Sequence, residues 1–157
     1  MRVSLALLVS VALAGCSQFG VDGLGLRADR SLSIVVPAQR SRVTTPLRVE
    51  WTDTTPKPGG SYLVLIDRSP MPPGETVRWF AKGDADCATT PTCPDEMYLA
   101  RRGVTVSMTT SVDISIVPAL KGSRKGTFHE LTIVRLDAGG RRDGETAATT
   151  QFKVVAP

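Results

Sequence analysis

Short stretches in which apolar and polar residues alternate dominate the chain from residue 31 onward. The clearest covers residues 47–52, where leucine, valine and tryptophan alternate with arginine, glutamate and threonine. Because successive side chains of a strand point to opposite faces, this pattern predicts a strand with one buried and one solvated face. Residues 31–36 predict another strand, ended by Pro37, and the more continuously apolar residues 62–67 predict a strand at the centre of a sheet.

The longest alternation covers residues 104–116, where every even position except Thr110 is apolar. These apolar residues are Val104, Val106, Met108, Val112, Ile114 and Ile116. We expect one bent strand or two, with this set of side chains facing the core throughout.

Residues 128–137 and 147–155 predict a closing hairpin, because the segment between them contains three glycines. The chain then has about seven strands and no helices, with turns rich in proline and glycine. This combination predicts an all-β fold in which two antiparallel sheets pack face to face.

Residues 68–103 interrupt this regular spacing and predict an insertion. Residues 70–74 are too proline-rich for a strand, residues 76–81 predict a strand around Trp79, and residues 82–95 predict a polar loop. Trp79, Phe80 and Tyr98 flank that loop and are candidate contacts for a protein or sugar partner. The alternative is that these aromatic residues cover the open edge of the sandwich.

The first 16 residues have the layout of an export signal. Arg2 precedes an uncharged apolar run over residues 3–13, which is shorter than the about 20 apolar residues of a membrane span. The following residues, Ala14, Gly15 and Cys16, complete with Leu13 a tetrapeptide that resembles the lipobox of bacterial lipoproteins. The resemblance implies a signal peptide over residues 1–15, cleavage before Cys16, and a diacylglycerol thioether on that cysteine.

Lipid at Cys16 would hold the protein on the extracytoplasmic side of the cell membrane or the outer membrane. The alternative is an ordinary secreted protein in which this cysteine has no such role. Residues 16–30 are mostly small and polar with three glycines, so we expect a flexible tether followed by one domain over residues 31–157.

The two remaining cysteines, Cys87 and Cys93, predict a disulfide, because an exported chain meets an oxidising compartment. Closing so short a loop stabilises the fold by only about 2.4 kcal/mol on the chain-entropy estimate. Zinc is the alternative, but His129 is the only histidine and a second cysteine pair is missing from the sequence.

Composition is that of an ordinary globular domain, with 41% hydrophobic and 22% charged residues among 157. The net charge of +4 is too small to indicate a nucleic-acid partner. Oxygen ligands gather near the cysteine loop at Asp84, Asp86, Asp95 and Glu96, but their spacing matches no calcium loop, so we interpret them as solvated acids. We therefore expect neither a metal nor a cofactor.

Four segments resemble a fibronectin type III or related bacterial immunoglobulin-like domain. Residues 47–51, 62–64 and 126–133 look like its second, third and sixth strands, and residues 136–140 look like its last turn. The resemblance implies such a sandwich over about residues 32–155. Two departures are the long insertion and His129, which stands where the family usually has a corner tyrosine and is expected to take that structural role.

No nucleophile, base and orienting group can be assembled, so we expect no catalytic residues. The predicted function is a lipid-anchored, extracytoplasmic binding or scaffolding module of the cell envelope, with an envelope protein or glycan as its partner. The alternatives are an accessory subunit of an envelope enzyme or transport complex, and a structural spacer.

Overall fold

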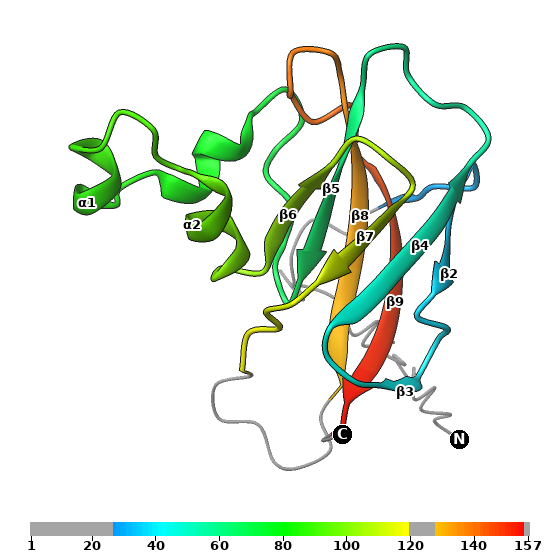
Figure 1. Cartoon of the computed structure of the whole chain (residues 1–157). Coiled ribbons are helices and arrows are strands. Elements are labelled where there is room, and N and C mark those ends of the chain that lie inside the picture. The colour runs from blue at the N-terminus through cyan, green and yellow to red at the C-terminus, as the bar shows by residue number, and fades with distance from the viewer. Residues whose placement is uncertain (1–26, 120–127, 156–157) are drawn as a thin grey trace, which may run out of the picture.

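The computed structural model describes residues 27–119 and 128–155 and contains two β-sheets that pack face to face (Figure 1). The smaller sheet has the order β2 (Leu32–Val36), β4 (Leu47–Asp53), β7 (Ser111–Ile114). The larger sheet has the order β1 (Arg27–Ala28), β9 (Thr146–Val154), β8 (His129–Leu136), β5 (Ser61–Ile66), β6 (Val104–Ser107), and β3 (Ser41–Val43) also pairs with β9. The predicted all-β, two-sheet sandwich is confirmed, but the described residues contain nine strands where the sequence predicts about seven, and β1 and β3 pair in parallel with β9. None of the helices in the two described ranges has the length and apolar character of a membrane span.

The first core lies between the two sheets. Trp51, Tyr62 and Phe152 are buried there, and for Trp51 the alternation over residues 47–52 predicts this burial. The rings of Trp51 and Tyr62 meet edge-on with their centroids 5.2 Å apart. Both sheets therefore contribute large side chains to one continuous apolar layer.

A second core lies on the outer face of the larger sheet. Leu63 and Leu65 of β5 point to this face and pack with Met71, Phe80 and Leu99 of the insertion. Every residue of β5 is buried as a result, because one face meets the other sheet and the opposite face meets the insertion. Residues 68–103 thus form a covering layer of the domain.

The expectation of no helices is wrong within this insertion, which contains η1 (Val77–Ala81), α1 (Ala85–Ala88) and α2 (Glu96–Ala100). The strand predicted over residues 76–81 is a 3₁₀ helix instead. Residues three apart share a face of a 3₁₀ helix, which brings Val77 and Phe80 onto the second core together. Asp84 and Asp95 accept backbone N–H groups at the starts of α1 and α2, so these acids cap helices.

The prediction of one inward face for residues 104–116 is also wrong in part. Val106, Met108 and Ile116 are 42%, 72% and 37% exposed, whereas Val104 and Ile114 are buried. The reason is that residues 108–110 carry the chain from β6 in the larger sheet to β7 in the smaller sheet. An unbroken period of two therefore spans two strands that face different layers.

The end of the predicted tether belongs to the fold. β1 pairs in parallel with the start of β9. Asp29, which follows β1, accepts hydrogen bonds from Ser31 and Thr146 and forms an ion pair with Arg135. Residues 27–30 are thus held by β8 and β9. The signal peptide, Cys16 and the rest of the tether lie outside the described residues.

Candidate functional site

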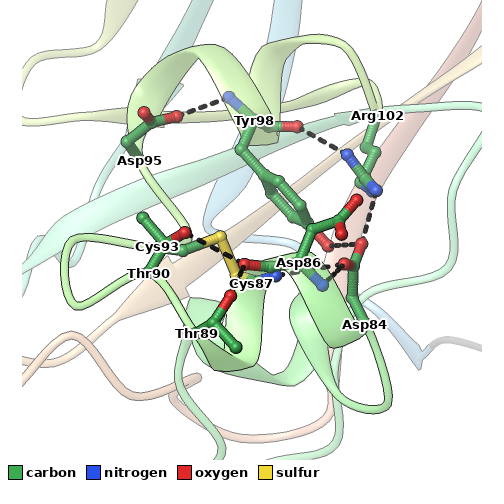
Figure 2. Close-up of a disulfide and its surroundings, with 9 residues drawn as sticks. All are labelled: Asp84, Asp86, Cys87, Thr89, Thr90, Cys93, Asp95, Tyr98 and Arg102. Atoms are coloured by element: carbon green, nitrogen blue, oxygen red, sulfur yellow. Dashed lines mark hydrogen bonds and ion pairs between the residues drawn. A yellow bond between two sulfur atoms is a disulfide. The ribbon is translucent and has the colours of Figure 1, made fainter.

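The cysteine loop is tied down at both of its ends (Figure 2). The predicted disulfide is confirmed, and it joins Cys87 in α1 to Cys93 shortly before α2. One carboxylate oxygen of Asp84 accepts hydrogen bonds from the Tyr98 hydroxyl and the Arg102 guanidinium, each at 2.8 Å. The Arg102 guanidinium also lies 3.6 Å from the centre of the Tyr98 ring. The segment that bears α2 is therefore held in one position by covalent, ionic and aromatic contacts.

Two acids of this loop, Asp84 and Asp95, have structural partners. The hydrogen bond from Tyr98 and those from the α1 backbone hold the pKa of Asp84 below its ordinary value. Asp95 accepts the backbone N–H of Tyr98 at 2.7 Å. Among the residues that the structure describes, three or more potential metal ligands do not come together anywhere.

The three predicted aromatic contacts are placed differently from one another. Trp79 is 36% exposed and meets Phe80 edge-on, with ring centroids 5.4 Å apart. Phe80 is only 6% exposed, because it lies in the second core, and Tyr98 is half-buried against Arg102 and Asp84. They do not form one exposed surface, and Phe80 covers the outer face of the larger sheet rather than the open edge that the alternative interpretation expects.

A groove of about 520 Å³ lies where α2 meets the open edges of both sheets. Figure 1 shows α2 beside β6, with β7 of the other sheet following across the short connection. The lining residues are Asp95, Glu96, Met97, Ala100, Thr105, Val106, Val112, Asp113, Ile114, Ser115 and Ile116. We call this the edge groove. Met97, Val106 and Ile116 expose apolar surface in it.

The β6 side of the edge groove has unpaired backbone groups. β6 is the last strand of the larger sheet, and the N–H of Ile66 in β5 donates to the carbonyl of Gly103 at 2.8 Å. Bonded and non-bonded positions alternate along an antiparallel pair, so the backbone groups of Val104 and Val106 point away from β5. Val104 is fully buried, which leaves Val106 as the accessible position.

The β7 side of the edge groove is open over a longer stretch. β7 is the last strand of the smaller sheet, and the N–H of Trp51 in β4 donates to the carbonyl of Thr110 at 3.0 Å. By the same alternation, the backbone groups of Ser111 and Asp113 point away from β4. The carbonyl of Ser111 accepts from the hydroxyls of Ser107 and Thr109. In the described part of the chain, no other strand or turn pairs with the N–H and carbonyl of Asp113.

The edge groove is acidic in a chain of net positive charge. Three carboxylates line it, at Asp95, Glu96 and Asp113, and its lining contains neither lysine nor arginine. Asp113 pairs with Arg48 at 3.1 Å on the exposed face of the smaller sheet. An apolar surface with an acidic rim favours a partner that is apolar and basic.

His129 takes a structural position at the start of β8. Its Nδ1 lies 2.6 Å from a carboxylate oxygen of Asp67, and its ring stacks on Phe152 with centroids 5.2 Å apart. It also lines a cavity of about 470 Å³ together with Thr45 and Ser115. Within the described residues, no hydroxyl or thiol forms a hydrogen bond with His129, so the histidine and its carboxylate lack an activated nucleophile.

The edge groove is the part of the site that sequence reasoning missed. The period of two predicts a core position for all four apolar strand residues of the groove, which are Val106, Val112, Ile114 and Ile116, and no pattern in the sequence singles out Met97. The three-residue link between β6 and β7 was the available clue, because a chain that crosses between sheets so quickly leaves two adjacent edges without a covering strand. Comparison of the chain with protein-family models, curated proteins and solved structures gives no match.

Proposed function

We propose that this chain is a lipid-anchored, extracytoplasmic binding or scaffolding module of the bacterial cell envelope, and that its partner binds in the edge groove. The observation that carries the binding role is the edge groove itself, where the free edges of both sheets meet exposed apolar side chains. Sheet edges are usually protected against pairing, and contiguous apolar surface usually marks an interaction site. The proposed activity is non-covalent binding without catalysis.

The anchor is proposed from the first 16 residues, with support from the disulfide. Bonds such as Cys87–Cys93 persist in oxidising compartments outside the cytoplasm. We expect the wild type to fractionate with membranes and Cys16→Ser to fractionate as a soluble protein, measured by carbonate extraction and immunoblotting. Equal membrane retention of both proteins contradicts lipid anchoring.

We further propose that the sandwich is of the immunoglobulin-like or fibronectin type III kind. Variable-type immunoglobulin domains extend their G-F-C sheet with a strand C′, opposite a sheet that begins A-B-E. The orders β9-β8-β5-β6 and β2-β4-β7 correspond to G-F-C-C′ and A-B-E. On this assignment the insertion joins C to C′.

A polypeptide partner is favoured over a glycan, because open edges can be used through main-chain hydrogen bonds. The same observation supports the second candidate, an accessory subunit that completes a larger envelope assembly. Trp79 stays in the proposal as a secondary contact, because it is the most exposed of the three aromatic residues.

The binding role is tested by a photo-crosslinking amino acid in place of Met97, in the full-length chain in intact cells. Met97 lies in the edge groove, whereas Glu75 is exposed elsewhere on the insertion and serves as the control position. We expect one adduct of defined mass at position 97 and none at position 75, identified by mass spectrometry. Absence of an adduct at position 97, or equal capture at both positions, overturns the binding role.

A further inference from the structure

Resting on the proposed function, we propose that the partner is an extended polypeptide segment that alternates apolar and basic residues and adds as a strand to the free edge of β7. The apolar side chains of that segment fill the edge groove, and its basic side chains meet the acidic rim. The smaller sheet thereby gains a fourth strand.

The β7 edge is favoured over the β6 edge by access. Five consecutive residues from Val112 to Ile116 line the edge groove, whereas α2 covers the start of β6 and Val104 is fully buried. The hydroxyls of Ser107 and Thr109 donate hydrogen bonds to the carbonyl of Ser111 and so occupy one end of the β7 edge. Strand addition therefore uses the outward N–H and carbonyl of Asp113, and β7 ends one residue later at Ile114.

The side chains around this edge specify an alternating partner. Successive side chains of an added strand point to opposite faces. One face meets Val106, Met97 and Ile116, which are apolar and exposed, and we expect aliphatic residues there. The other face runs past Asp113, and Glu96 is a second carboxylate in the lining of the edge groove, so lysine or arginine is expected on that face.

Charge argues against a second copy of this chain as the occupant. An edge-to-edge pair would bring the acidic rims of two edge grooves together, with Asp95, Glu96 and Asp113 of each copy in proximity. Like charges placed face to face oppose association. A basic segment of a different protein carries the opposite charge and is therefore attracted to the acidic rim.

The test uses the purified protein and three synthetic peptides of seven residues. The first alternates four lysines with three valines, and the second replaces each lysine with glutamate. The third is the lysine peptide with N-methyl groups on both its lysine and its valine amides, so that antiparallel and parallel addition are both blocked. We expect the lysine peptide to bind, to shift the amide resonance of Asp113, and to slow the hydrogen exchange of that amide. The glutamate and N-methyl peptides should each bind at least about tenfold more weakly.

Protein variants supply the matched controls. Asp113→Pro removes an outward N–H without removing a bond to β4, so it should abolish binding while Asp113→Glu retains it. Glu96→Lys should weaken binding of the lysine peptide about tenfold, and Glu75→Lys should leave it unchanged. Circular dichroism and thermal melting of each variant separate lost binding from lost folding, and the N-methyl peptide tests the same bonds without altering the protein.

The outcomes distinguish this inference from the proposed function. Equal binding of lysine and glutamate peptides, or binding that tolerates N-methylation, overturns strand addition by a basic segment. Concentration-dependent dimerisation in sedimentation experiments that Asp113→Pro abolishes also overturns it, in favour of a second copy. If position 97 still captures a partner in cells in these cases, the binding role stands and only the mode of binding is wrong.

Discussion

A single arginine joins the start of the described chain to both sheets. The Arg135 guanidinium donates to the two carboxylate oxygens of Asp53 at 2.7 and 2.6 Å and also pairs with Asp29. Tyr62 donates its hydroxyl to Asp53 at 3.0 Å. Buried charges are costly unless they are paired and hydrogen-bonded, and here each has several partners. The cluster connects β8 with the end of β4 and the residue that follows β1.

This cluster predicts acid sensitivity. Burial alone would raise the pKa of Asp29, but hydrogen bonds from Ser31, Thr146 and Arg135 outweigh burial and lower it from 3.8 to about 2. Because the pKa of Asp29 is lower in the folded state, its ionised carboxylate stabilises the fold at pH values above the pKa of the unfolded chain. This contribution is lost as the pH falls from about 4 to 2. We expect this loss to be about 2 kcal/mol smaller in Asp29→Asn, measured by urea unfolding between pH 7 and 2.5. Asp86→Asn is the control, and identical pH profiles for wild type and Asp29→Asn would contradict the assignment.

Among the elements, η1 shows how the insertion is attached. It places Phe80 into the second core, and the neighbouring Trp79 lies partly exposed beside it. Arg142, in the turn between β8 and β9, donates to the backbone carbonyl of Met71 in the insertion at 2.6 Å. The insertion is thus held by an apolar contact and by a buried arginine.

The two neighbouring aromatic residues of η1 should differ sharply in their effect on stability. We expect Phe80→Ala to lower the free energy of unfolding by about 3–5 kcal/mol, because it leaves a cavity in the second core. Trp79→Ala should cost less than about 1.5 kcal/mol, because little more than the edge-on contact is lost. Thermal and chemical denaturation of both variants provides the comparison. Similar losses for the two substitutions would show that η1 is placed wrongly.

At the scale of the whole molecule, the larger sheet is shared by two cores. Leu63, Leu65, Val134 and Leu136 face the insertion, while the opposite side of the same strands packs against the smaller sheet. An ordinary sandwich leaves its outer faces to water, as the alternation of β4 does here. The outer face of the larger sheet instead depends on residues 68–103.

Removal of the insertion should therefore expose an apolar sheet face. We expect replacement of residues 68–102 by an Asn-Gly turn to give an aggregating product that binds a hydrophobic dye, as seen by size-exclusion chromatography and fluorescence. Adding Leu63→Thr and Leu65→Thr to the same replacement should restore part of the solubility. A soluble monomer that melts at the wild-type temperature without these substitutions would contradict the role of the insertion as a covering layer.

Local chemistry in the sequence determined most of the strands, most of the inter-sheet core and the disulfide, but not the short strands β1 and β3. The period of two located β4, the proline and glycine turns bounded the strands, and the spacing of Cys87 and Cys93 suited a short closed loop. These properties depend on residues near one another in the chain, so they can be read without knowing the fold. The short helices escaped that reading, because packing on the sheet decided their conformation.

Only the tertiary structure decided which faces and edges are covered. Val106 and Ile114 belong to one uninterrupted alternation, yet they lie in different sheets, one exposed and one buried. Burial depends on what packs against a face, and an edge is open only when no distant segment pairs with it. The edge groove and the second core both arise from contacts between residues far apart in sequence, and for that reason the period of the side chains could not reveal them.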